Sequence, residues 1–187
     1  GGSTPATATQ TPVPPTDNWP LYTNATYGFQ FKYPPGSERF FEAANNILIK
    51  MPIAPGTNLS EKYLQMTVRE NVDPCQSPLS DISRPGSPTE TVVFNGISFF
   101  KQIGVDAGVG HLHAFVGYST LKNNACISMD FVLHSLAAGN SDPPQPEFDK
   151  VAESVVFTQV MSTFTFVAPV PTPTSTATSA PPTPTPT

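Results

Sequence analysis

Charged residues are scarce in this chain of 187 residues: Lys and Arg number 9, Asp and Glu number 14, and together they make up 12% of the sequence. The formal net charge of −5 is spread along the chain without runs of one sign. Proteins that bind nucleic acid or an anionic membrane surface usually concentrate basic residues. The composition therefore argues against nucleic acid as a partner.

Long hydrophobic runs are also missing. No apolar stretch approaches the roughly 20 residues that a helix needs to cross a bilayer. No segment has the basic start, apolar centre and small-residue end of a signal peptide. We predict no transmembrane segment and interpret the chain as already processed. Its first residues, Gly-Gly-Ser-Thr-Pro-Ala-Thr, resemble the spacer behind the acylated cysteine of bacterial lipoproteins, so a lipid anchor upstream of Gly1 is a further hypothesis.

Every charged residue lies between positions 17 and 168. Residues 1–16 and 169–187 are rich in Pro, Thr, Ser and Ala and carry no charge. Such segments cannot bury enough apolar surface to offset chain entropy, and repeated proline favours an extended conformation. We predict a single folded domain over residues 17–168, flanked by a Pro/Thr-rich linker and a Pro/Thr-rich tail. Stalks of this composition are typical of extracellular or cell-surface proteins.

The chain contains only two cysteines, Cys75 and Cys126, which stand 51 positions apart. Neither has a Cys-x-x-Cys partner or a histidine at zinc-finger spacing. In an oxidising compartment we expect the two cysteines to form an intramolecular disulfide rather than an intermolecular bridge or free thiols. Metal ligation is the least favoured interpretation.

Short stretches with a period of two predict an antiparallel sheet. Phe29, Phe31 and Tyr33 share one strand face, and Asn95-Gly96 predicts a type I′ hairpin turn. The spacing of apolar residues predicts a helix near residues 150–163. We expect an α+β domain, with an antiparallel sheet of about six or seven strands packed with one or two helices. The strands are expected within residues 29–33, 46–51, 62–70, 91–94, 97–103, 110–120, 125–134 and 164–167.

Two segments between these strands are expected to be irregular. Residues 73–90 contain four prolines and little hydrophobic periodicity, and a loop of this length usually carries function or needs an anchor, which Cys75 would supply. Residues 104–110 are glycine-rich but open no helix, so they are expected to form a flexible connection rather than a phosphate loop.

Several motifs resemble bacterial PsbP-like lipoprotein or secreted domains. They are Tyr22-Thr23-Asn24, the aromatic strand over residues 27–34, the Phe94-Asn95-Gly96-Ile97 hairpin and the final stretch over residues 157–166. The resemblance covers residues 19–167 as spaced islands. It implies a central antiparallel sheet covered by helices and a non-enzymatic accessory, binding or assembly role. The loop with Cys75 and the Pro/Thr-rich tail at the C terminus depart from this pattern.

Three histidines form the main candidate site. Strand parity places His111, His113 and His134 on one face of the second hairpin, with Asp130 on the same face. Imidazoles in neighbouring strand positions can bind zinc or copper, although ordinary surface histidines are the favoured alternative. Phe115 and Val132 share this face, which predicts that another segment packs over part of it.

Motifs for catalysis are missing, whereas modification motifs are present. No serine lies in a Gly-x-Ser-x-Gly elbow and neither cysteine has the partners of a nucleophile, so we predict no enzymatic activity and no cofactor. Asn24-Ala25-Thr26 and Asn58-Leu59-Ser60 match the N-glycosylation pattern, and the tails have the composition of O-glycosylated stalks.

The sequence is compatible with three functions. The favoured one is an extracellular or cell-surface structural or adhesive module, a candidate subunit of a polymer or filament, that contacts copies of itself, other surface proteins or glycans. The second is a monomeric lipoprotein domain that binds a ligand or serves as an accessory subunit. The third is a metal-binding protein that uses the histidine face.

Overall fold

A computed structural model describes residues 15–82, 89–137, 139 and 142–168. The predicted tail over residues 169–187 and all but the last two residues of the N-terminal linker lie outside these ranges. The end of the predicted loop over residues 73–90 also lies partly outside them. The predicted domain boundaries stay predictions.

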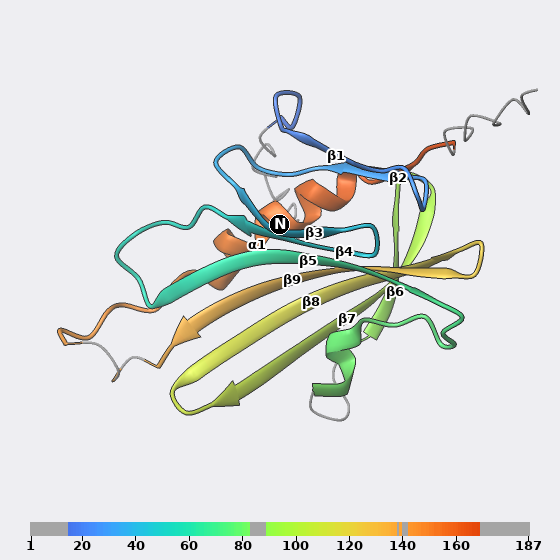
Figure 1. Ribbon diagram of the computed structural model, residues 1–187. Helices are drawn as coiled ribbons and strands as arrows, with labels where there is room; N and C mark the ends of the chain where they lie inside the picture. The colour runs from blue at the N-terminus through green and yellow to red at the C-terminus, as the bar shows by residue number, and fades with distance from the viewer. Residues whose placement is uncertain (1–14, 83–88, 138, 140–141, 169–187) are drawn as a thin grey trace, which may run out of the picture.

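The main sheet has seven antiparallel strands in the order β3-β4-β5-β9-β8-β7-β6 (Figure 1). A smaller sheet has the order β1-β2-β10, and helix α1, Lys150–Ser162, comes between β9 and β10 in the chain. The strands are β1 Leu21–Asn24, β2 Phe29–Lys32, β3 Glu38–Ala43, β4 Asn46–Met51, β5 Leu59–Glu70, β6 Thr89–Phe94, β7 Ile97–Gly108, β8 His111–Lys122, β9 Ala125–Leu136 and β10 Thr165–Phe166.

The predicted α+β class is wrong, because the described residues are mostly strand. They hold ten strands and one α-helix of 13 residues, with a short 3-10 helix, η1, at Pro78–Ile82. The expected single sheet is split: β1 and β2 do not join the main sheet but pair with β10. Pro34-Pro35 ends β2, and Gly36 takes a φ of 79° that suits the change of direction.

The glycine-rich stretch over residues 104–110 is also not the flexible connection that we predicted. Strand β7 runs through it to Gly108, and Val109-Gly110 forms a two-residue turn with φ angles of 48° and 79°. Gly104 pairs with Phe115 and Gly108 with His111 on β8. Pairing with β8 across this tight turn therefore outweighs the weak strand preference of glycine.

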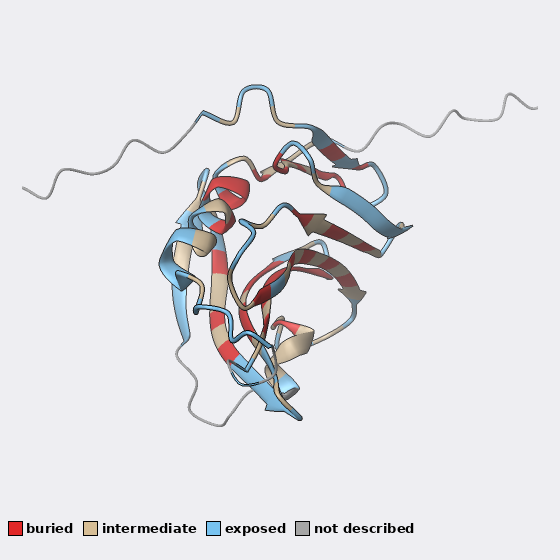
Figure 2. Cartoon of the chain, turned by 90° about the vertical axis from the view of Figure 1, so that its left-hand side faces the viewer, coloured by how far each residue is buried: buried red, intermediate tan, exposed pale blue. Residues whose placement is uncertain are grey.

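The core lies between α1, the small sheet and one face of the main sheet. Phe131 of β9 stacks on Phe157 of α1 with ring centroids 4.7 Å apart, and Phe99 meets Phe164 edge to face at 5.3 Å. Figure 2 shows buried residues on α1 and alternating with less buried ones along the strands. Lys62 of β5 also forms an ion pair with Glu153 of α1 at 2.6 Å. The opposite face of the main sheet points away from this core.

Candidate functional site

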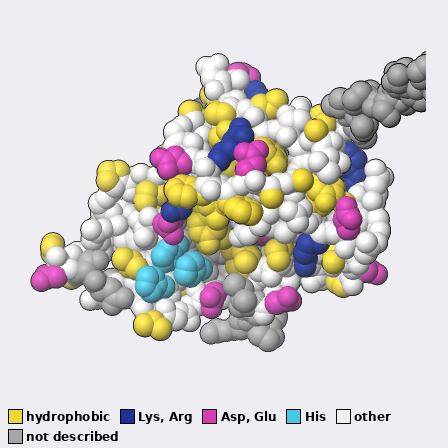
Figure 3. All heavy atoms as spheres, viewed as in Figure 1, with side chains coloured by type: hydrophobic (Ala, Val, Ile, Leu, Met, Phe, Trp, Pro, Cys, Tyr) yellow, Lys and Arg dark blue, Asp and Glu magenta, His cyan; other side chains and the backbone are white. Residues whose placement is uncertain are grey.

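The candidate site lies on the main-sheet face that points away from α1, which we call the front face. Register defines it: Tyr63 pairs with Val132, Val132 with Phe115, and His113 with His134. Directly paired residues share a face, so aromatic, aliphatic and imidazole side chains lie side by side there. Figure 3 shows the histidines clustered beside a hydrophobic area on this face.

The proline-rich segment with η1 packs over one end of the front face, as the positions of Phe115 and Val132 predicted. A disulfide between Cys75 and Cys126 fastens this segment to β9, with a Cα–Cα distance of 5.3 Å. The predicted intramolecular disulfide is thereby confirmed. The backbone N–H of Ser77 donates to Oε1 of Gln102 on β7 at 2.8 Å, which makes a second attachment to the sheet.

Asp130 lies beneath this segment with only 1% of its surface exposed. Its Oδ1 accepts a hydrogen bond from the Ser77 hydroxyl. Burial raises the pKa of Asp130 to about 7, while Ser77 and the positive charge of Arg69 act in the opposite direction. A carboxyl enclosed in this way fixes the segment to the sheet and cannot reach a substrate.

Gly117 of β8 makes this close approach sterically feasible. It pairs with Asp130, and a Cβ at this position would lie 2.5 Å from Oδ1 of Asp130 and 2.8 Å from Cβ of Ser77. Sequence reasoning missed this cluster. The sequence does contain one indication of this cluster: Gly117 lies in the middle of a strand, and such a glycine often marks the close approach of another segment.

The three histidines come together at the other end of the face. The rings of His113 and His134 stack with centroids 4.2 Å apart and an interplanar angle of 10°. Nδ1 of His111 lies 2.8 Å from Nε2 of His134, and Nδ1 of His134 lies 3.2 Å from Oε2 of Glu61. Oε1 of Glu61 in turn accepts from Nζ of Lys50 at 2.6 Å. The cluster is therefore a hydrogen-bonded chain of side chains.

This arrangement does not favour a metal site. Nearly parallel stacked rings direct their nitrogens along separate planes, whereas a metal needs ligand atoms that converge on one point. Both nitrogens of His134 already face other side chains. Across the described ranges, no group of three or more His, Cys, Asp or Glu side chains is placed to hold a metal ion.

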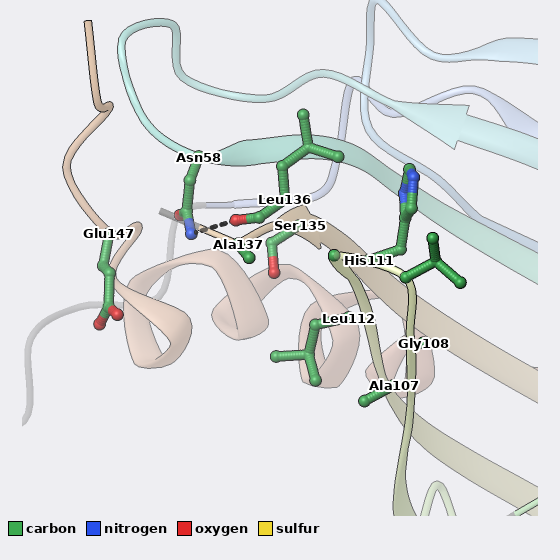
Figure 4. A pocket seen from close by; sticks show the side chains of 11 residues that line it. Asn58, Ala107, Gly108, His111, Leu112, Ser135, Leu136, Ala137 and Glu147 are labelled. Carbon is green, nitrogen blue, oxygen red and sulfur yellow. Dashed lines mark hydrogen bonds between the residues drawn. The ribbon is translucent and has the colours of Figure 1, made fainter. Parts of the chain in front are cut away.

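Two hollows border the histidines. One, of about 170 Å³, is lined by Tyr63, Leu79, Asp106, His113, Phe115 and Val132. The other, of about 460 Å³, lies where the β7–β8 turn meets the end of β9, with His111 at one side and Glu147 at another (Figure 4). Neither lining includes a cysteine thiol, and the only hydroxyl besides that of Tyr63 belongs to Ser135, which is 3% exposed.

The side chains of both predicted glycosylation sites hold the fold together. Asn24 is 4% exposed, and its Nδ2 donates to the Ala44 carbonyl at 2.8 Å and to the Tyr22 hydroxyl at 3.3 Å. Nδ2 of Asn58 donates to the Leu136 carbonyl at 2.9 Å, and its Oδ1 accepts from the Phe148 N–H at 3.0 Å. A glycan on Asn24 would disrupt these contacts, because the side chain is enclosed in the folded protein.

An exposed aromatic patch, formed by Phe40, Phe41, Leu48 and Tyr63, continues the front face to its edge. Phe40 is 58% and Phe41 57% exposed, whereas Leu48 and Tyr63 are half-buried. The register of β3 shifts between Arg39 and Phe41, and Phe41 pairs with Leu48. A bulge of this kind changes the direction in which a side chain points. The Lys50 side chain lies over the Phe40 ring, with its Nζ 4.5 Å from the ring centroid. Both phenyl rings therefore lie toward the front face.

Comparison with known proteins gives no family assignment. No family model matches the chain, and no curated protein matches its sequence. A crystal structure from Bacteroides thetaiotaomicron VPI-5482 shares 13% identity and a TM-score of 0.47 over 79% of this chain and 48% of that one. LpqN, described as involved in cell envelope biogenesis of Mycobacterium tuberculosis, shares 12% identity and a TM-score of 0.46 over 81% of this chain and 87% of that one.

The chain thus spans about half the length of the Bacteroides protein. Neither structure confirms the resemblance to PsbP-like domains. Within the described ranges, no helix has the length and apolar character required to cross a bilayer.

Proposed function

We propose that the chain is a non-enzymatic extracellular or cell-surface module that works by binding other macromolecules through its aromatic patch. The observation that carries this proposal is the exposure of Phe40 and Phe41, at 58% and 57%, beside a core that already buries the other face of the sheet. Adjacent exposed aromatic rings are costly in water and typically mark an interaction surface.

The disulfide supports a location outside the cytoplasm. The Cys75–Cys126 bond joins the segment that carries η1 to the central strand β9. Cytoplasmic thiols are kept reduced, whereas such bonds persist in secreted and surface proteins.

The state of the acidic side chains supports a role in binding rather than catalysis. Glu61 is held by Lys50 and His134, and these contacts lower its pKa. Asp130 is enclosed under the proline-rich segment. A general acid or base must reach the substrate, so neither carboxyl is placed for that role.

An adhesion assay tests the proposal. The wild-type protein, the double variant Phe40→Ser/Phe41→Ser and the control Val93→Ser are immobilised at equal density, and binding of envelope fragments from the source cells is measured. Val93 is a matched control because it is 63% exposed on β6, at the opposite edge of the main sheet. We expect at least a tenfold loss of binding for the double variant and none for Val93→Ser. Equal binding by all three proteins would contradict the proposal.

A further inference from the structure

Strand β3 forms one edge of the main sheet and, among the described strands, pairs with β4 alone. Its residues from Glu38 to Glu42 are all exposed. An edge strand presents unpaired backbone groups to solvent, and natural proteins usually shield such edges. The β3 edge carries a bulge and charged side chains, and between them two adjacent exposed phenyl rings.

The two sides of this edge differ in chemistry. Phe40 and Phe41 lie toward the front face, whereas Arg39 and Glu42 pair with core-facing residues of β4, Ile49 and Ile47. The Arg39 guanidinium lies 3.3 Å from Oε2 of Glu42 and remains accessible, because the two side chains are 38% and 51% exposed. One side of the edge thus carries both phenyl rings together with Glu38, which pairs with Lys50, and the other side carries the Arg39–Glu42 ion pair.

Tyr33 holds the Arg39 side chain in place. Nε of Arg39 donates to the Tyr33 hydroxyl at 3.0 Å, and its Cζ lies 5.4 Å from the centre of the Tyr33 ring. A guanidinium has five N–H donors, and the contacts with Tyr33 and Glu42 use only some of them. Arg39 is therefore oriented in advance for a further carboxylate.

The sequence of β3, Glu-Arg-Phe-Phe-Glu-Ala, complements itself when two copies run antiparallel about the midpoint between Phe40 and Phe41. In this alignment Arg39 lies opposite Glu42 of the second copy, and Phe40 lies opposite its Phe41. The two-fold axis repeats each pairing. Opposite charges and aromatic rings in facing positions are both favourable cross-strand pairs.

We propose that the chain forms a two-fold dimer in which β3 pairs with β3 of a second copy. This inference rests on the proposed function and names the partner of the aromatic patch. The bulge at Phe40 interrupts the edge, so the backbone ladder is short and the aromatic and charged side chains supply most of the affinity. Dimerisation is therefore reversible and weakens as salt concentration rises.

Charge exchange tests this pairing. Arg39→Glu leaves acidic side chains at both positions 39 and 42, and Glu42→Arg leaves basic ones. Each variant alone repels its own copy, whereas an equimolar mixture restores both ion pairs between unlike chains. By sedimentation equilibrium over a range of concentrations, we expect wild-type dimers, at least tenfold weaker association of each variant alone, and recovery in the mixture.

Lys101→Glu serves as the control, because it alters an exposed ion pair with Glu90 at the opposite edge of the sheet. It is expected to dimerise like the wild type. A monomeric wild type at all concentrations, or a mixture no more associated than its components, would overturn the dimer.

Loss of the dimer and loss of the proposed function are distinguishable. If the wild type is monomeric while Phe40→Ser/Phe41→Ser still abolishes binding to envelope fragments, the self-pairing fails and the binding role stands. If Phe40→Ser/Phe41→Ser leaves that binding unchanged but abolishes the dimer, the self-pairing stands and the broader binding role fails.

Discussion

The hydroxyl of Ser77 donates a hydrogen bond to Oδ1 of Asp130, and this contact joins the proline-rich segment to the middle of the main sheet. Both residues are 1% exposed. The second carboxyl oxygen, Oδ2, is buried and has no hydrogen-bond partner among the described residues. An ionised carboxylate is poorly solvated in such surroundings, which is why burial raises the pKa of Asp130 to about 7.

This pKa predicts a specific dependence of stability on pH. The folded value of about 7 lies above the ordinary value of 3.8, so the folded protein binds the proton more tightly than the unfolded chain. The contribution of Asp130 to the free energy of unfolding is therefore fully present below about pH 4 and is lost as pH rises to about 7. Since one pKa unit corresponds to about 1.4 kcal/mol, the loss amounts to a few kcal/mol.

Urea unfolding of the wild type and Asp130→Asn between pH 4 and pH 8 measures this effect. The neutral amide cannot titrate, so the difference in stability between the two proteins must change across this range in favour of the variant. A difference that stays constant with pH would show that Asp130 is ionised throughout.

Gly117→Ala is predicted to destabilise the same cluster. The added methyl group would lie 2.5 Å from Oδ1 of Asp130, closer than such contacts allow, so β8 or the proline-rich segment must shift. Overpacking of this kind typically costs about 1–3 kcal/mol. Gly108→Ala is the matched control, because its Cβ would meet nothing within 4 Å. Urea unfolding should show a clear loss of stability for Gly117→Ala and only a small change in stability for Gly108→Ala. Equal losses of stability would contradict the close approach of Gly117 to Asp130 and Ser77.

The disulfide is predicted to be a major source of stability. Linking residues 51 positions apart restricts the unfolded chain, and the chain-entropy model gives about 4 kcal/mol for a loop of this length. We expect Cys75→Ser/Cys126→Ser to lower the free energy of unfolding by about this amount in urea titrations. Reducing agent should destabilise the wild type and leave the double variant unchanged, and an unaffected wild type would contradict the prediction.

Elements with local sequence signals could be predicted well. Asn95-Gly96 forms the predicted turn with φ angles of 50° and 76°, and Asn123-Asn124 turns the second hairpin with φ angles of 47° and 67°. Helix α1 begins where Asp149 caps it, with Oδ1 accepting the N–H groups of Val151 and Ala152. Turn chemistry and capping depend on neighbouring residues, so the sequence contains them directly.

Features that depend on distant contacts could not be predicted. β2 pairs with β10 through Gln30 and Thr165, and this pairing is what divides the strands between two sheets. Strand β3 lacks alternation because a bulge interrupts it, so no period of two marks it. A glycosylation motif likewise says nothing about burial, and Asn24 proves to be enclosed.

The histidine cluster predicts an unusual titration of His113. Burial is the main cause that lowers the pKa of His113, and the charge of His134 lowers it further, while Asp106 acts in the opposite direction. NMR titration should therefore place His113 below the ordinary value of 6.5. His134→Gln should move this midpoint up, and Asp106→Asn should move it down.

Because the folded pKa of His113 is depressed, the contribution of His113 to stability is present above pH 6.5 and is lost as pH falls through the folded value. His113→Gln should remove that acid-dependent loss, and an unchanged pH profile would exclude His113 as its source.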